Sequence, residues 1–180
     1  MNLPNKLTVL RMIMVPFFIA AFMSENYLIA LVIFAAASLT DLFDGQIARK
    51  YNLITNFGKI MDPLADKILV YSALCLFLEG GLITGWMLII ILAREFIVAG
   101  MRTVAASEGR VLAADMSGKI KTVLQMVGVT IMILGLAFSE QYDFALLIYD
   151  IGYYIFLASL LATVYSGFEY VIKNKDVFSV

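Results

Sequence analysis

Two stretches of this chain combine aspartates with small residues: DLFDGQIAR at residues 41–49 and GKIMDPLAD at residues 58–66. They contain four aspartates, Asp41, Asp44, Asp62 and Asp66, in surroundings that are mostly apolar. Carboxylates are unfavourable near a lipid bilayer, and four of them at one level repel one another unless positive charge compensates them. Oxygen ligands suit hard divalent cations. The pattern therefore predicts that these aspartates bind two divalent cations, Mg²⁺ or Mn²⁺.

The spacing places each pair of aspartates on one face of a helix. Asp41 and Asp44 are three residues apart, and Asp62 and Asp66 are four apart. We expect the first pair at the end of one helix. We expect Asp62 to cap the next helix, with Pro63 at its first position, where no amide hydrogen is needed. Two helix ends joined by a short loop then bring all four carboxylates together.

Small residues and an arginine accompany the aspartates. Gly45, Ala48 and Gly58 leave room for a ligand to approach the backbone, and Arg49 offers two parallel donors to a phosphate. A single aspartate at a helix end is usually a solvated cap, and two carboxylates one turn apart are often a structural pair. The complete combination favours metal-dependent chemistry at phosphorus, in which two ions about 4 Å apart clamp the reacting group.

The rest of the chain indicates a membrane protein. Of its 180 residues, 62% are hydrophobic, and no linker rich in Pro, Gly or Ser divides it. Six apolar segments approach the roughly 20 residues that a spanning helix needs, and their length favours helices over barrel strands. These segments are residues 7–23, 27–48, 62–80, 83–106, 118–138 and 144–172. We therefore predict an all-α, polytopic membrane protein with six transmembrane helices and a single domain over residues 1–180.

Charge placement predicts the orientation. If the segments alternate across a membrane, the loops on one side contain Glu25, Glu79, Glu140 and Asp143 but no lysine or arginine. The basic residues lie at the other ends, so both termini are expected to be cytoplasmic. We expect the first segment to be retained rather than cleaved as a signal peptide, because Arg11 and Pro16 interrupt it. The aspartates then lie on the cytoplasmic side.

Two residue counts exclude other kinds of site. The chain has no histidine, which removes the Ser-His-Asp triad and every zinc site with a histidine ligand. Its single cysteine, Cys75, excludes a disulfide within one chain and lies in an apolar run. Acid–base chemistry must therefore come from carboxylates, lysines or tyrosines.

The aspartate pattern resembles a known family. Asp-x-x-Asp-Gly-x-x-Ala-Arg, eight residues, then Gly-x-x-x-Asp-x-x-x-Asp is the signature of CDP-alcohol phosphatidyltransferases, and this chain matches it without departure. Softer similarities at residues 2–11, 58–67 and 118–122 look most like phosphatidylglycerophosphate synthases. The resemblance extends over most of the chain and implies six spans and a homodimer in the plasma membrane, with an active site facing the cytoplasm.

The resemblance also implies a reaction, in which CDP-diacylglycerol and sn-glycerol 3-phosphate give phosphatidylglycerophosphate and CMP. One substrate is a membrane lipid and the other is a soluble anion, so we expect a cavity between helices at the cytoplasmic level. Asp41, Asp44 and Asp62 are expected to hold the metal ions. Asp66 is expected to take the proton from the glycerol hydroxyl and to touch the second ion.

The nucleotide contacts follow from the same resemblance. Gly45, Ala48, Arg49, Thr55 and Gly58 match family positions that hold the cytidine diphosphate. Two residues of the first segment, Asn5 and Thr8, either line the same pocket or cap the helix.

Binding the phosphate of the acceptor alcohol requires positively charged side chains. Arg110, Lys119 and Lys121, at the ends of the fourth and fifth segments, are the candidates; the alternative is that they only set the topology. Arg94 falls inside the fourth segment, where a charge is unfavourable. It is expected either to line the acceptor pocket or to form a structural pair with Glu95 or Asp150.

Other functions stay open. The same chemistry with inositol phosphate, serine or phosphatidylglycerol as acceptor differs only in pocket shape. A divalent-cation transporter is a further alternative, although the carboxylates cluster on one side and no inverted repeat is evident. A scaffold protein would have no use for the motif, and no nucleic-acid partner is expected.

Overall fold

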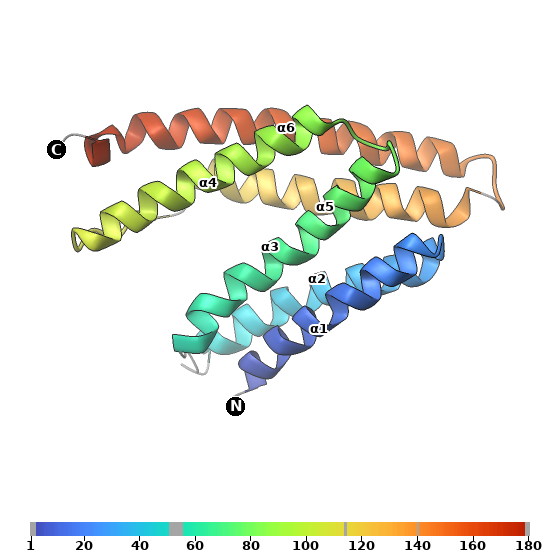
Figure 1. The fold of residues 1–180 in the computed structure, drawn as a ribbon, viewed down its shortest axis with the longest axis horizontal. Helices are drawn as coiled ribbons and strands as arrows, with labels where there is room; N and C mark the ends of the chain where they lie inside the picture. The colour runs from blue at the N-terminus through green and yellow to red at the C-terminus, as the bar shows by residue number, and fades with distance from the viewer. Residues whose placement is uncertain (1–2, 51–55, 114, 140, 179–180) are drawn as a thin grey trace.

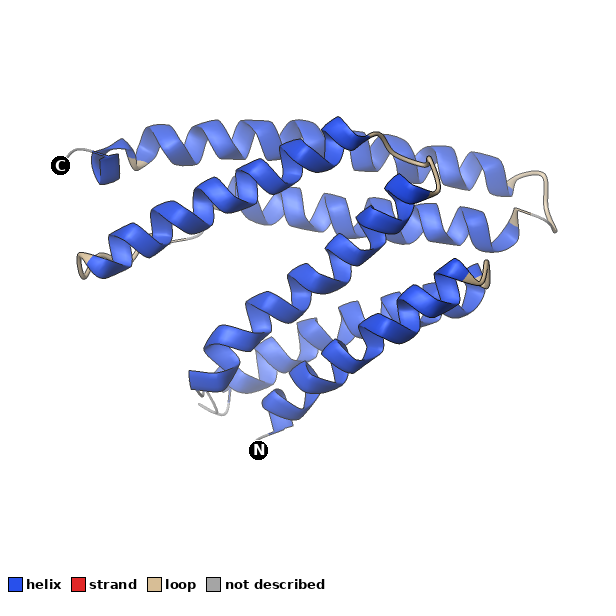
Figure 2. Cartoon of the chain, viewed as in Figure 1, coloured by secondary structure: helices blue, strands red, loops and turns tan. Residues whose placement is uncertain are grey.

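The computed structural model describes the backbone of residues 3–50, 56–113, 115–139 and 141–178, and it leaves the side chains of residues 3–4, 41–50, 56–57, 59–60, 66 and 178 undescribed. Within those ranges the regular structure is entirely helical, which confirms the all-α prediction (Figure 2). The elements are α1 (Leu3–Met23), α2 (Tyr27–Lys50), α3 (Asn56–Glu79), α4 (Gly85–Ser107), α5 (Met116–Phe138), α6 (Ala145–Lys173) and the short 3₁₀ helix η1 (Lys175–Phe178).

The start of α3 differs from the sequence prediction. The helix begins at Asn56, so Asp62 and Pro63 lie inside it, and the expectation that Asp62 caps the helix is wrong. Pro63 lacks an amide hydrogen and therefore removes one backbone hydrogen bond, to the carbonyl four residues earlier. The residues before it nevertheless continue the helix toward its N-terminus. As a result, Asp62 is available for a contact with another helix.

The helices differ in whether their length and hydropathy are sufficient to cross a membrane. Among the described residues, Asn5–Met23, Met116–Phe138 and Ala145–Lys173 are long and apolar enough to cross a membrane, and Tyr27–Thr40 is a shorter apolar helix. The six-span prediction is thus supported for three helices by length and composition. Helices α3 and α4 contain charged residues such as Lys67 and Glu95, which reduce their hydropathy.

Two groups of helices make up the molecule (Figure 1). Helix α1 packs against α2 and α3, α5 packs along α6, α4 contacts α6, and α2 contacts α5 and so joins the groups. The turns after α1, α3 and α5 lie toward the right of Figure 1, whereas the ends of α2 and α4 and both ends of the chain lie toward the left. The helices therefore alternate in direction, as the sequence pattern predicts.

The buried face of α1 changes character along its length. Near the N-terminus it presents Asn5, Thr8 and Arg11, which are all buried, and further along it presents Phe18 and Phe22. The two phenylalanines pack with Phe34 of α2 and Phe77 of α3, with ring centroids 5.5–6.0 Å apart. This aromatic cluster fixes α1 to its neighbours and leaves the polar part of its face beside the N-terminal half of α3.

Candidate active site

The backbone brings the two halves of the aspartate motif to one end of the molecule. Asp41 and Asp44 lie in the C-terminal part of α2, and Asp62 and Asp66 lie in the N-terminal half of α3. These ends meet near the N-terminus of α1 at the lower left of Figure 1. The side chains of Asp41, Asp44 and Asp66 are outside the described residues. So are those of Gly45, Ala48 and Arg49, and Thr55 lies outside altogether.

Asp62 is the one predicted metal ligand whose side chain the structure describes. Its Oδ1 accepts a hydrogen bond from Thr8 Oγ1 at 2.5 Å, which links α1 to α3. Thr8 is fully buried, and Asn5 and Gly58 are buried as well. Since the described part of α1 begins at Leu3, Thr8 lies beyond the capping position. This location favours a role beside the aspartate motif over helix capping.

The aspartates suit divalent cations by their chemistry. Four carboxylates form an all-oxygen donor set, which matches the preference of Mg²⁺ and Mn²⁺. Among the side chains that the structure describes, no group of three or more potential ligands converges on one point. Three of the four predicted ligands lie outside that set.

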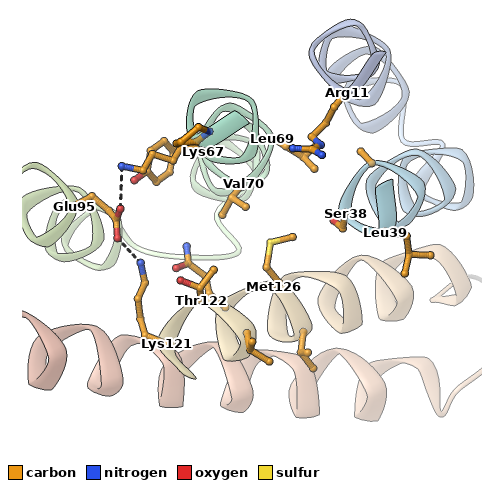
Figure 3. A pocket seen from close by; sticks show the side chains of 16 residues that line it. Arg11, Ser38, Leu39, Lys67, Leu69, Val70, Glu95, Lys121, Thr122 and Met126 are labelled. Atoms are coloured by element: carbon orange, nitrogen blue, oxygen red, sulfur yellow. Dashed lines mark hydrogen bonds and ion pairs between the residues drawn. The ribbon is translucent and has the colours of Figure 1, made fainter. Parts of the chain in front are cut away.

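A cavity of about 470 Å³ lies beside the N-terminal half of α3. Its walls come from α1 to α5 and are mostly apolar, with Leu39, Val70 and Met126 among the side chains that Figure 3 labels. The polar and charged groups among its lining residues include Arg11, Ser38, Lys67, Tyr71, Glu95, Lys121, Thr122 and Gln125. A mostly apolar cavity with several cations suits a ligand that is both lipid-like and anionic.

Charges from three helices meet at Glu95 in the wall of this cavity (Figure 3). Lys121 Nζ of α5 lies 2.6 Å from Glu95 Oε1, and Lys67 Nζ of α3 lies 3.3 Å from Glu95 Oε2. Arg94 Nη1 lies 2.9 Å from Oε1. Lys121 is almost fully buried, whereas Lys67 is partly exposed. Three cations around one carboxylate leave an excess of positive charge.

Arg94 stands behind this cluster rather than in the cavity wall. It pairs with Glu95, which is one of the two partners that the sequence suggests. A Cβ added at Gly118 would lie 2.9 Å from Arg94 Nη2, and one at Gly167 would lie 3.1 Å from Arg94 Cγ. The two glycines therefore provide the space in which the arginine packs between α5 and α6.

The other candidate acceptor cations lie elsewhere. Arg110, in the connection after α4, donates to Asp176 of η1 and also lies near Glu108. Lys119 is exposed on the first turn of α5. Of the acceptor cations predicted from the sequence, Lys121 lines the described cavity, while Lys119 and Arg110 are not among its described lining residues.

Comparison with known proteins identifies the family of the chain. The sequence model of the CDP-alcohol phosphatidyltransferase family matches residues 1–165. The chain belongs to the CDP-alcohol phosphatidyltransferase family.

Curated relatives narrow the similarity. A CDP-diacylglycerol--glycerol-3-phosphate 3-phosphatidyltransferase of Bacillus subtilis is 39% identical, and the alignment covers 97% of this chain and 96% of the relative. A protein of the same name in Rickettsia felis is 38% identical over 98% of this chain and 97% of its own. A probable phosphatidylglycerophosphate synthase of Mycobacterium tuberculosis is 37% identical over 96% of this chain and 81% of its own.

Several residues that line the described cavity are not predicted from the sequence. The sequence predicts no site role for Arg11, Lys67 or Gln125, and it predicts Glu95 only as a partner for Arg94. Arg11 follows Thr8 by three residues, so helical spacing places both on one face. Gln125 follows Lys121 by four residues on α5 in the same way. These spacings were the available signal, but only the tertiary structure shows which faces meet.

Proposed function

We propose that this phosphatidyltransferase transfers a phosphatidyl group from CDP-diacylglycerol to sn-glycerol 3-phosphate and releases phosphatidylglycerophosphate and CMP. The observation that supports this most strongly is the 37–39% identity, over nearly the whole chain, to relatives that bear this enzyme name or the name of phosphatidylglycerophosphate synthase. The intact aspartate motif and the cation-lined cavity beside it add support. Phosphatidylglycerol biosynthesis is the corresponding metabolic role.

The aspartates define the reacting end of the site. Asp41, Asp44, Asp62 and Asp66 would hold two divalent cations, which would stabilise the negative charge that develops on the diphosphate as CMP leaves. Thr8 orients Asp62 through its hydrogen bond. Asp66 acts as the base that accepts the proton of the attacking glycerol hydroxyl, since the chain has no histidine to do so.

Substrate binding divides between the motif and the cavity. Gly45, Ala48, Arg49, Thr55 and Gly58 hold the cytidine diphosphate, with Asn5 and Thr8 on the facing side of α1. Lys121 binds the phosphate of the acceptor from the cavity wall, and the apolar part of the wall accommodates lipid. Arg110, Lys119 and Arg94 contribute positive potential around the acceptor rather than lining the described cavity.

The membrane arrangement is also part of the proposal. All six helices cross the plasma membrane, both termini and the site face the cytoplasm, and the protein works as a homodimer. The alternation of the helices and their exposed apolar side chains, such as Phe17, Phe96 and Leu161, support membrane insertion. Charged groups in α3 and α4 then face the cavity instead of lipid.

One experiment tests reaction type, metal need and acceptor together. Purified protein is given CDP-diacylglycerol and one of sn-glycerol 3-phosphate, inositol phosphate, serine or phosphatidylglycerol, and CMP release is measured with Mg²⁺, with Mn²⁺ and with excess EDTA. We expect release only with sn-glycerol 3-phosphate and only with a divalent cation. Release with a different acceptor would change the assigned substrate, and undiminished release in EDTA would remove the metal from the proposal.

A further inference from the structure

Glu95 is an acidic residue in a cavity that is otherwise suited to an anion. Its side chain is only 13% exposed, and its two oxygens face different helices. Oε1 accepts from Lys121 of α5 at 2.6 Å, and Oε2 lies 3.3 Å from Nζ of Lys67 of α3. A buried carboxylate in this position needs a reason, because it weakens the positive charge of the cavity.

Arg94 fixes the orientation of the Glu95 side chain. Arg94 Nη1 donates to Oε1 at 2.9 Å, and Arg94 is itself confined between Gly118 and Gly167. Gly118 lies beside the guanidinium and Gly167 beside the aliphatic part of Arg94, so the arginine packs closely against α5 and α6. Glu95 is thus held on one side by a packed arginine and faces the two lysines on the other.

This arrangement solves a problem that two lysines alone would create. Lysine has a long, flexible side chain, and two ammonium groups that approach the same point repel each other. A carboxylate between them attracts both and offsets the repulsion. Each ammonium has three N–H donors, so each keeps donors for a ligand after pairing with Glu95. Lys67 also follows Asp66 directly in the sequence, which sets the pair beside the aspartate motif.

We propose that Glu95 is a positioning residue for the acceptor: its carboxylate holds Lys67 and Lys121 together so that their remaining N–H donors bind the phosphate of the acceptor alcohol. This inference rests on the proposed function, since it assigns the phosphate to sn-glycerol 3-phosphate. Glu95 itself does not contact the reacting atoms. Its effect is on the binding of the acceptor rather than on the lipid substrate.

The test is the Glu95→Gln variant of the full chain, which keeps the shape of the side chain and removes its charge. We expect the apparent KM for sn-glycerol 3-phosphate to rise about tenfold while the KM for CDP-diacylglycerol changes less than about twofold. The matched control is Glu169→Gln, which breaks the 2.6 Å ion pair to Lys173 away from the cavity and should leave both constants unchanged. An unchanged acceptor KM, or an equal rise in both constants, would overturn the inference.

A double-mutant cycle tests whether Glu95 acts through Lys121. Lys121→Met alone should raise the acceptor KM at least as much as Glu95→Gln does. If the glutamate works by placing the lysine, combining the two changes should raise KM far less than the product of the separate effects. Fully multiplicative effects would show independent roles and contradict the proposal.

Two further measurements keep the outcomes separate. If Glu95→Gln does not fold, Glu95→Asp replaces it. The shorter side chain then falls short of the lysines, and an unchanged acceptor KM would again overturn the inference.

If the wild type releases no CMP with sn-glycerol 3-phosphate, the proposed acceptor is wrong. In that case thermal stabilisation by inorganic phosphate decides: stabilisation of the wild type that Glu95→Gln loses supports the positioning role, and equal behaviour of both proteins rejects it.

Discussion

Thr8 and Asp62 show how a single hydroxyl on α1 reaches the aspartate motif on α3. The hydrogen bond between them is short, at 2.5 Å, and Thr8 is fully buried. A donor that orients a metal ligand fixes the position of the oxygen that faces the ion. If Asp62 holds a metal ion as proposed, the Thr8 hydroxyl orients that ligand without touching the metal.

Replacing Thr8 by valine removes this donor and keeps the shape of the side chain. Because loss of a partner that orients a ligand typically weakens metal affinity or activity by about 10-fold to 100-fold, we expect a shift of at least about tenfold in the Mg²⁺ concentration that half-activates CMP release. The control is Thr103→Val, since Thr103 is exposed and bonds only to the carbonyl of Ala99 in its own helix. Identical metal titrations of wild type and Thr8→Val would contradict the assignment.

Asp66 is proposed as the base, and its substitution by asparagine tests that role. Loss of a general base typically reduces turnover by about 10²-fold to 10⁴-fold, so we expect kcat to fall by at least about 100-fold. Binding of Mn²⁺, followed by electron paramagnetic resonance, checks that the metal is still present. Asp150→Asn, a change at an exposed position of α6, is the control. Near-normal turnover by a metal-bound Asp66→Asn protein would show that another group takes the proton.

At the scale of the elements, α5 and α6 approach each other closely through glycines. A Cβ added at Gly135 would lie 2.6 Å from the backbone nitrogen of Tyr149, and one at Gly152 would lie 2.6 Å from that of Met132. Backbone atoms of a packed helix cannot yield as a flexible side chain can. The small residues therefore determine how near the two axes come, as in many membrane helix pairs.

Gly135→Ala should consequently destabilise the protein. An alanine in a helix is normally favoured over glycine by about 0.5–1 kcal/mol, but overpacking against the α6 backbone costs about 1–3 kcal/mol. We expect a lower thermal unfolding temperature in detergent. Gly100→Ala on α4 is the matched control, because nothing lies within 4 Å of its added Cβ, and it should leave the temperature unchanged or raise it. Equal behaviour of the two variants would refute the role of the close approach.

The sequence predicted these elements well because long apolar runs are a local property. Each of the six predicted segments corresponds to a helix, and the largest error is the start of α3, where the helix extends six residues beyond the predicted residue 62. That start depends on how the residues before Pro63 pack, which local patterns do not encode. The aspartate motif was recognisable for a similar reason, since its residues are close together in the chain. The meeting of Lys67, Glu95 and Lys121 was not, because it needs three helices to come together.

At the scale of the whole molecule, the connection after α4 is tied to the C-terminal segment. Arg110 donates to Asp176 in η1, while Val177 packs with Val98, Met101, Ala105 and Tyr170. The hydrogen bond from Arg110 holds the pKa of the Asp176 carboxyl below its usual value. The described residues of η1 are thus attached to α4 and α6 through the Arg110–Asp176 ion pair and this apolar cluster.

This attachment should depend on pH. Because the pKa of Asp176 is lower in the folded than in the unfolded protein, its stabilisation is complete above the unfolded value of about 3.9 and is lost as the pH falls through the folded value. Thermal unfolding of wild type and Asp176→Asn should therefore differ at pH 7 and converge as the pH falls well below about 3.9. High salt should reduce the difference, since the Arg110 and Asp176 side chains are 45% and 53% exposed to solvent. A difference that grows on acidification would contradict this sign.

The buried face of α1, which is polar near the N-terminus and aromatic further along, has a consequence for biosynthesis. Helix α1 leaves the ribosome before α3, so Thr8 meets its partner Asp62 only after more than fifty further residues have been made. Arg11, almost wholly buried in the finished protein, is unfavourable in lipid on its own during that interval. We therefore expect Arg11 to stay near the membrane surface, or in contact with the insertion machinery, until the helices that bury it have been made. The hydrogen bond that joins α1 to the aspartate motif can therefore form only after α3 has been made.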